Sequence, residues 1–507
     1  MTNALSDTVQ PESYKDNPFI FRLPPTLSKD AFEKRSILLP GFDATVRNLP
    51  SEVRLHFIAT VHDLFIPLPR HYQLYTCIDR MIRRGYITRN PMEQAFYWKD
   101  LRKQVEALAS EVHAPAKLQR SDLGQSSELS QALIGLSGSG KTWGTEAILS
   151  YFPKKIVHVD YNGIGLNILQ VPWLWIQAPS KSSTNELCNE FFLALDRILD
   201  THYYETYGNR VLREMMDQMA RLCGVHAIGL LVIDEIQEVA NIKSGGHEAL
   251  IGFFLKLTNI LRIPILMIGT YKARSILFNQ LRLARRSCGA GIPEWSPLNK
   301  EEWEVLSQAM WPHQYTKTPV AWSRELSDAL YEECQGIPDV GAKMFVLAQQ
   351  RAILSRGPAE KERISAKLFK SVAKKELGPL KPILDAIQKR DYEALLRLDD
   401  VKLPSIQEML AMREPGPNQT ASSEAEANLP EPSPISRQSE VAQSEQAPSH
   451  SVAAPPVQRL VLKPVLTQIA KEAQQASEEI DPLKTYEALR LAGWIKPANE
   501  FWNEASA

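Results

Sequence analysis

The sequence predicts an α/β fold in which helices flank a parallel β-sheet that carries a phosphate-binding loop. The first indication is residues 135–142, GLSGSGKT, which fill the pattern G-x-x-x-x-G-K-[ST] between an apolar run and a helical segment. The second is residues 229–235, GLLVIDE, an apolar run that ends in two carboxylates. The third is residues 264–270, PILMIGT, an apolar run that ends in a hydroxyl. Such runs are typical of strands that are buried on both faces of a parallel sheet.

The loop at residues 135–142 has the residue types that binding of nucleotide phosphates requires. Its glycines allow consecutive backbone N–H groups to point inward at the phosphates, and the next helix aims its positive N-terminus at the same place. We expect Lys141 to reach the outer phosphates and Thr142 to bind Mg²⁺. A Gly/Ser-rich turn between a strand and a helix is the alternative, which the complete match disfavours. The predicted phosphate-binding residues are Gly135, Ser137, Gly138, Ser139, Gly140, Lys141 and Thr142.

The ends of the two later apolar runs supply the second half of this predicted ATP site. Asp234 would hold Mg²⁺ together with Thr142, and Glu235 would orient and deprotonate the attacking water. In P-loop enzymes with an additional strand, a polar side chain between these two motifs senses the γ-phosphate, and Thr270 fits that position. The alternatives are an acidic pair that only caps the next helix and a threonine that only ends a strand.

The rest of the chain divides by composition and periodicity. We expect a helical, partner-binding region at 1–110, a nucleotide-binding core at 111–298, a helical lid at 299–377 and a helical extension at 378–412. Residues 413–457 are rich in Pro, Ser, Ala, Gln and Glu, which predicts a disordered linker. Residues 458–507 recover apolar residues but are too few to bury them. We therefore expect a partner-docking tail that folds on binding, or one that docks back on the protein's own body.

Local patterns predict further elements. Apolar residues at helical spacing indicate helices at 54–65, 71–84, 302–310, 323–334, 342–354 and 365–377, with two more between 379 and 410. Runs at 156–159 and 171–177 have the β-branched and aromatic content of strands. Ser183 and Glu186 have the spacing of a capping box, which predicts that a helix begins there.

Positive charge is concentrated in one part of a chain whose formal net charge is only -1. Between residues 249 and 293 there are basic residues but no Asp or Glu. We expect Arg285 or Arg286 to project into a neighbouring subunit as an arginine finger. Other basic residues would contact DNA phosphates, and for each of them a solubilising surface charge remains an open alternative. The predicted DNA-binding residues are Lys181, Lys243, Lys272 and Arg274.

Other features set limits on the class of protein. The five cysteines are far apart, odd in number and without a C-x-x-C pair, which suits core positions in a reducing cytoplasm. The first residues lack the features of a signal peptide, and no apolar run approaches the length of a membrane span, so we expect a cytoplasmic protein without a membrane partner. Four arginines cluster near 80–89, either as a phosphate or partner contact or as a solvated helix end.

Five sequence segments together resemble TnsC, the AAA+ ATPase regulator of Tn-seven-like transposons, which is related to TniB and IstB. They are YKDNPFI at 14–20, GLLVIDEIQ at 229–237, SGG at 244–246, IGT at 268–270 and LARR at 283–286. The resemblance covers about residues 11 to 400. It implies an AAA+ P-loop core with a helical lid that oligomerises on duplex target DNA when ATP is bound, as a ring or helix of six or seven subunits per turn. It also implies that the protein bridges a target selector of the TnsD or TniQ type to the TnsA and TnsB transposase, with ATP turnover governing target-site choice.

The lid departs from the pattern of this class of ATPase at one position. A second sensor, an Arg near a Gly-x-Pro turn, usually contacts the nucleotide, but here the turn at 336–339 reads GIPD. Asp339 replaces the expected Arg, and Lys343, one helical turn later, is the nearest cation. The role of Lys343 is open between a nucleotide contact and a surface lysine.

Two other functional classes share the predicted core. An IstB/DnaC-like helicase loader would not need the long N-terminal region or the aromatic tail. A non-hydrolysing ATP-binding scaffold is disfavoured because Lys141 and Glu235 are both present.

Overall fold

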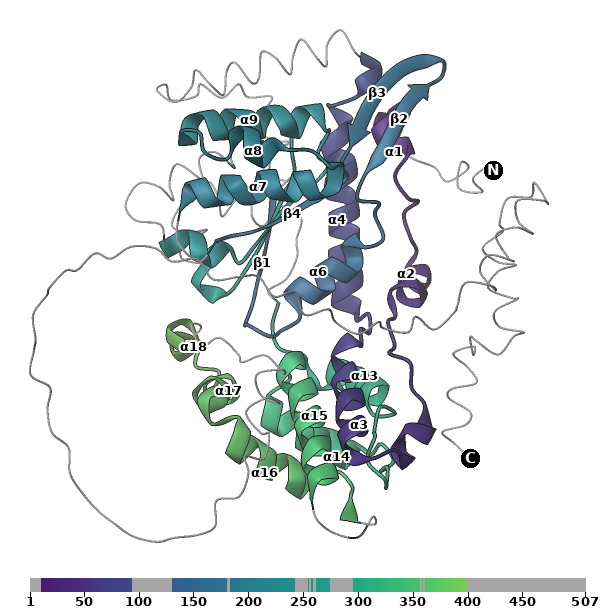
Figure 1. The fold of residues 1–507 in the computed structure, drawn as a ribbon, viewed down its shortest axis with the longest axis vertical. Coiled ribbons are helices and arrows are strands. Elements are labelled where there is room, and N and C mark those ends of the chain that lie inside the picture. Colours follow the sequence, from purple (N-terminus) through teal and green to yellow (C-terminus); the bar gives the residue numbers. More distant parts are fainter. Residues whose placement is uncertain are drawn as a thin grey trace, which may run out of the picture. The chain divides into compact units, whose positions relative to one another are not determined.

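The central element is a four-stranded parallel sheet with the strand order β1-β6-β5-β4 (Figure 1). Its strands are β1 (Ser130–Ile134), β6 (Ile265–Gly269), β5 (Leu231–Asp234) and β4 (Leu174–Gln177). The prediction of a parallel sheet flanked by helices is confirmed. Because β6 pairs with both β1 and β5, the residues that follow these three strands meet at one edge of the sheet. The computed structural model describes residues 11–93, 130–179, 183–241, 254, 257–258, 261–273, 295–355, 358 and 361–398.

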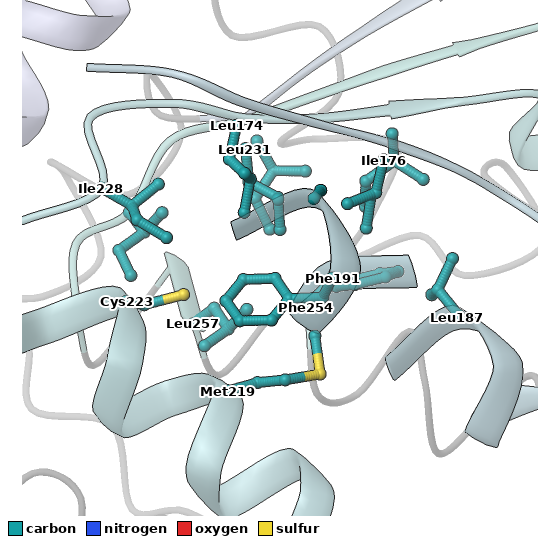
Figure 2. Packing of buried hydrophobic residues seen from close by; sticks show 14 of the residues in the cluster. Leu174, Ile176, Leu187, Phe191, Met219, Cys223, Ile228, Leu231, Phe254 and Leu257 are labelled. Carbon is teal, nitrogen blue, oxygen red and sulfur yellow. The ribbon is translucent and has the colours of Figure 1, made fainter. Parts of the chain in front are cut away.

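The apolar runs are continuous because both faces of the sheet are covered. Leu231 and Ile233 of β5 face one apolar cluster, whereas Val232 and the preceding Leu230 face another. Helices α7 (Thr184–Leu199) and α9 (Leu212–Val225) cover the first face, and α4 (Pro69–Ile87) and α6 (Lys141–Leu149) cover the second (Figure 1). Figure 2 shows the first cluster, in which side chains of α7 and α9 pack against β4 and β5, including Phe191, Met219, Cys223, Leu174 and Leu231.

The N-terminal region does not form a core of its own. Helices α1 (Pro18–Phe21), α2 (Lys29–Ser36) and α4 contribute to the apolar cluster beside the sheet. The 3-10 segments η2 (Ala44–Asn48) and η3 (Ala59–Asp63) and helix α3 (Ser51–Ile58) contribute to the cluster of the lid instead. A buried ion pair between Arg54 and Glu362 fastens this second part to the lid. The described residues of the predicted partner-binding region are therefore integral to the folds of both the core and the lid.

Two arginines of the 80–89 cluster are internal. The Arg83 Nε atom donates a hydrogen bond to Asp79 at 2.9 Å, and the Arg89 Nη1 atom donates one to the Ile228 carbonyl at 2.7 Å. Both arginines are buried, so neither interpretation made from the sequence applies to them. Arg80 and Arg84 are exposed on the same helix.

The lid is helical, as predicted. It contains α13 (Lys300–Met310), α14 (Arg324–Cys334), α15 (Pro338–Leu354) and α16 (Ala366–Glu376), and the extension contains α17 (Lys381–Lys389) and α18 (Tyr392–Leu398). Helix α15 begins four residues earlier than the periodicity indicates because Pro338 occupies its first turn. Backbone N–H groups in the first turn have no partner within the helix, so the missing N–H of a proline costs no hydrogen bond there. The start of α15 at Pro338 brings the Asp339 backbone to the phosphate loop.

Some local predictions were wrong or incomplete. Helix α7 begins where the capping box predicts, but the Ser183 side chain makes no capping hydrogen bond. The predicted strand at 171–177 is confined to β4, and an antiparallel hairpin precedes it, formed by β2 (Ile156–Tyr161) and β3 (Ile164–Gln170). Short helix α8 (Tyr203–Tyr207) was not predicted. Four cysteines are buried and unpaired, and burial raises the pKa of each to about 12; Cys288 is outside the described residues.

By internal contacts the chain separates into residues 1–417 and 418–507, and every described residue belongs to the first unit. The predicted linker and tail lie outside the described residues. Within the described part, no helix is long and apolar enough to span a membrane.

Candidate functional site

The loop that follows β1 has the backbone conformation of a phosphate cradle. Gly138 and Gly140 have φ angles of +75° and +85°, in the left-handed region that glycine adopts without steric cost. Gly140 is the N-cap of α6, so the loop ends at a helix N-terminus whose partial positive charge favours an anion. The Lys141 ammonium is buried and donates hydrogen bonds to the carbonyls of Gly135 at 2.9 Å and Leu136 at 2.6 Å. The loop therefore holds the ammonium beside the N-terminus of α6.

Trp295 supports this loop, although the sequence motifs gave no indication of it. The Trp295 backbone N–H donates to the Ile134 carbonyl at 2.9 Å, and its indole Nε1–H donates to the Ser139 carbonyl at 2.8 Å. A Cβ atom at Gly135 would overlap the Trp295 carbonyl, so this close approach requires glycine. Trp295 thus fixes both ends of the loop. A lone tryptophan 153 positions downstream of Thr142 carries no sequence signal for such a role.

Thr142 and Asp234 meet as the sequence predicts for a pair that holds Mg²⁺. The Thr142 hydroxyl donates a hydrogen bond to the Asp234 Oδ2 atom at 2.9 Å, and the Glu235 backbone N–H donates to Oδ1 at 2.8 Å. Burial raises the pKa of Asp234 above its ordinary value, while these two hydrogen bonds act in the opposite direction. A hydroxyl and a carboxylate beside the phosphate loop form an oxygen donor set of the kind that Mg²⁺ prefers.

Glu235 lies next to this pair in a constrained conformation. Its φ angle is +54°, which is uncommon for a residue other than glycine and costs of order 1–3 kcal/mol. The Gln237 amide donates a hydrogen bond to the Glu235 carboxylate, and the Gln237 Oε1 atom accepts one at 3.0 Å from the backbone N–H of Thr270. Gln237 therefore links the end of β5 to the end of β6. The sequence motifs did not indicate a role for Gln237, although it lies only two residues beyond Glu235.

Thr270 presents a hydroxyl that lacks a partner. Its Oγ1 atom is buried and makes no hydrogen bond to any described residue, although buried polar groups are almost always bonded. Thr270 lines the same cavity as the loop, Thr142, Asp234 and Glu235, although its Oγ1 atom is itself buried.

The cavity enclosed by these residues has a volume of about 320 Å³ and is bounded by three parts of the fold. This volume is in the range of small-molecule sites. One end is polar and belongs to the core. The other walls come from the η3 segment and from the lid, and sequence reasoning did not assign them to the site; they include Val61, His62, Leu64, Leu306, Met310, Pro338 and Ala342.

The lid reaches the phosphate loop directly. The Asp339 backbone N–H donates to the Gly138 carbonyl at 3.2 Å, and the Asp339 carboxylate accepts a hydrogen bond from the Lys343 ammonium at 2.7 Å. The Lys343 side chain is only 7% exposed, so it is not the surface lysine of the alternative interpretation. Asp339 lines the cavity and neutralises this buried ammonium.

Most of the residues predicted to contact DNA or a neighbouring subunit are outside the described part of the chain. Lys181, Lys243, Arg274, Arg285 and Arg286 lie outside the described residues. Lys272 is described and partly exposed, two positions after Thr270. Their assignments to DNA and to a neighbouring subunit stay predictions.

The residues present fit a nucleoside triphosphate with Mg²⁺. One cavity is lined by the glycine loop and by Lys141, Thr142, Asp234, Glu235 and Thr270. When bound, Mg²⁺ would neutralise the charge that develops on the phosphate oxygens. The protein's own groups supply cations, backbone donors and one carboxylate base candidate, which is a set suited to phosphoryl transfer.

A comparison with known protein families agrees with this geometry. Residues 125–277, which include the phosphate loop and β1 to β6, match the family model described as the AAA domain. The solved structures that are similar include the Walker-type ATPase of Pyrococcus abyssi, at 14% sequence identity and a TM-score of 0.33, covering 62% of this chain and 86% of that chain. No curated protein matches. The chain therefore contains an AAA domain.

Proposed function

We propose that this protein is an ATP-binding and ATP-hydrolysing AAA+ regulator of DNA transposition, similar to TnsC. The observation that supports ATP hydrolysis is the Thr142–Asp234 hydrogen bond at 2.9 Å beside Lys141, with Glu235 and Thr270 lining the same cavity. The AAA domain match supports nucleotide binding in general. The role in transposition is supported by the five sequence segments that resemble TnsC.

The polar residues at the core end of the cavity have distinct tasks in the proposed mechanism. The loop amides and Lys141 bind the phosphates, while Thr142 and Asp234 provide oxygen ligands for Mg²⁺. Glu235 accepts the proton of the attacking water, and its hydrogen bond from Gln237 sets the direction of the carboxylate. The Thr270 hydroxyl bonds the γ-phosphate and so reports whether it is present.

Hydrolysis in this proposal depends on assembly. Arg285 or Arg286 of an adjacent subunit completes the site, a contribution that in other nucleotide hydrolases is worth ~10³–10⁵ in rate. Lys181, Lys243, Lys272 and Arg274 contact the phosphates of duplex target DNA, and many weak contacts in one oligomer add up to firm binding. The ATP-bound oligomer bridges a TnsD/TniQ-type selector to TnsA and TnsB, and hydrolysis releases it from DNA.

Sedimentation with duplex DNA tests the proposal. The full chain is compared in ATP, in a non-hydrolysable ATP analogue and in ADP, with Lys141→Ala as the control that lacks the phosphate-binding ammonium. We expect a large DNA-bound species in both triphosphate forms only, and none with Lys141→Ala. A protein that stays small in all three nucleotides would contradict the assembly mechanism and favour a helicase loader or a scaffold.

A further inference from the structure

The Arg70 guanidinium contacts three parts of the chain at the point where the core continues into the lid. Arg70 lies in the first turn of α4, outside the AAA domain match at 125–277. Its Nε atom donates a hydrogen bond to Glu302 of α13 at 2.8 Å, and its Nη1 atom donates one to the Ser296 carbonyl at 2.6 Å. Its central carbon lies over the Trp295 ring, 5.4 Å from the ring centroid. One side chain therefore contacts the lid, the segment that leads into it and the residue that supports the phosphate loop.

The segment 295–299 is itself bonded to both the phosphate loop and the lid. Trp295 is hydrogen-bonded to both ends of the loop, and the Leu298 backbone N–H donates to the Gly336 carbonyl of the lid at 2.8 Å. The Glu302 carboxylate accepts a hydrogen bond from the Asn299 backbone N–H at 3.2 Å, so the same carboxylate binds this segment and Arg70. Because one short segment is bonded on both sides, its position affects the loop and the lid together.

The contacts of Arg70 suit a guanidinium better than an ammonium. A guanidinium is planar, so its edge can bind a carboxylate while its face stacks on an aromatic ring, whereas an ammonium is a point charge. The Arg70 and Glu302 side chains are only 15% and 13% exposed, so solvent screens their ion pair less than it screens a surface pair. Arg70 is bound along its edge, at its tip and on its face, which leaves the side chain little freedom to move.

We propose that Arg70 is a positioning residue for nucleotide binding, which holds the Trp295 indole and, through it, the phosphate loop in the geometry that binds phosphates. A loop that is already ordered binds its ligand more tightly, because less conformational freedom is lost on binding. Arg70 is not among the described residues that line the cavity, so it acts through Trp295 and not by touching a phosphate. This assignment rests on the proposed nucleotide binding and adds a residue of the N-terminal region to it.

Four variants of the full chain separate positioning from a general loss of stability. Arg70→Met removes the guanidinium, and Arg70→Lys keeps a positive charge without the planar fork. Trp295→Phe keeps an aromatic ring but lacks the N–H group that donates to the Ser139 carbonyl. Arg351→Met is the matched control, because Arg351 forms an ion pair with Glu376 inside the lid at 3.8 Å, with side chains that are 19% and 20% exposed.

Dissociation constants are measured for ATP and for inorganic tripolyphosphate, and the unfolding temperature is measured without nucleotide. We expect Arg70→Met to weaken binding of both ligands by the same factor, roughly 5- to 30-fold, because the loop holds the phosphates that the two ligands share. Arg351→Met should lower the unfolding temperature and leave both dissociation constants unchanged.

The other two variants test the route of the effect. Arg70→Lys should lower the unfolding temperature less than Arg70→Met, because it keeps a charge beside Glu302, yet it should lose most of the same affinity. In the Trp295→Phe background, Arg70→Met should weaken binding by a further factor of about two or less, because the ring no longer donates to the loop.

Several outcomes would overturn this assignment while nucleotide binding stands. They are wild-type affinity in Arg70→Met, an equal loss of affinity in Arg351→Met, and an undiminished effect of Arg70→Met in the Trp295→Phe background. Wild-type affinity in Arg70→Lys would also overturn it, and this variant decides the matter if Arg70→Met does not fold. A wild-type protein that binds ATP and tripolyphosphate no better than Lys141→Ala would instead overturn the proposed function itself.

Discussion

Replacing Asp339 by Asn tests whether Lys343 contacts the nucleotide. In the structure the Asp339 carboxylate holds the Lys343 ammonium at 2.7 Å, beside the phosphate loop. If a phosphate of ATP forms an ion pair with the Lys343 ammonium, the wild-type protein must first break the ion pair between Lys343 and Asp339. Asp339→Asn removes the charge that competes with the phosphate and keeps the backbone hydrogen bond to Gly138. We therefore expect the substitution to raise ATP affinity.

The magnitude follows from the exposure of the two partners. Removing one member of a fully buried ion pair costs about 3–5 kcal/mol, whereas exposed pairs contribute about 0–1 kcal/mol. Lys343 is 7% exposed and Asp339 is 30% exposed, which places this pair between the limits, at about 2 kcal/mol. Released in full on binding, that energy corresponds to roughly a 30-fold gain in ATP affinity. Loss of this ion pair in nucleotide-free Asp339→Asn should lower the unfolding temperature of the protein.

Calorimetric titration with ATP measures the gain, with two further variants as controls. Asp63→Asn removes an exposed negative charge that also acts on His62, and it should give a much smaller gain. In the Lys343→Ala background, Asp339→Asn should have little effect, because the competing ammonium is gone. Unchanged or weaker ATP binding by Asp339→Asn would refute a phosphate contact by Lys343. An equal gain in ATP affinity from Asp339→Asn in the Lys343→Ala background would refute it as well.

Three other substitutions address the proposed catalytic carboxylate, the phosphate loop and a buried histidine. Glu235→Gln should keep ATP binding, abolish turnover and trap the oligomer on DNA, measured by phosphate release and sedimentation. Gly135→Ala should lower the free energy of unfolding by about 1–3 kcal/mol and weaken ATP binding, because its Cβ would displace the backbone of Trp295. Thermal unfolding measures the loss of stability, and titration with ATP measures the loss of affinity. Burial first, and then Arg70, lower the pKa of His71 to about 3 from an ordinary 6.5, so folding disfavours its protonation. Its stabilising contribution is complete above pH 6.5 and is lost as the pH falls toward 3, by about 2 kcal/mol at pH 5. His71→Gln should therefore be less sensitive to acid than wild type in denaturant unfolding.

Each of these three expectations has an outcome that would contradict it. A Glu235→Gln protein that released DNA as readily as wild type would contradict the hydrolysis step. Gly165→Ala is the control for Gly135→Ala, because a Cβ there meets nothing within 4 Å, and equal effects of the two would contradict the packing argument. Identical losses of stability between pH 8 and pH 5 in wild type and His71→Gln would remove His71 as the source.

Much of the site was predictable because its parts are short motifs at the ends of strands. A glycine-rich loop and an all-apolar strand that ends in Asp234 and Glu235 carry their meaning in a few neighbouring residues. The parallel sheet then brings their ends together, since β6 lies between β1 and β5. The Thr142–Asp234 contact follows from that strand order.

The capping box and the N-terminal region show where local patterns were insufficient. Ser183 and Glu186 have the spacing of a capping box, yet the Ser183 side chain makes no capping hydrogen bond. The spacing identifies residues that could form a cap but does not determine the direction of their side chains. Residues 11–93 look like a separate helical region by periodicity. Their apolar faces are instead divided between the core and the lid.

The sequence by itself determined the phosphate loop, the two acidic residues, the buried strands and the helical lid, because each depends on residue types at fixed local spacing. Tertiary structure alone decided that Trp295 supports the loop, that Asp339 neutralises Lys343 and that His62 reaches the nucleotide cavity. These contacts join segments far apart in the chain or depend on which face of a helix is buried. Their positions are set by the packing of whole elements, which no single stretch of sequence encodes.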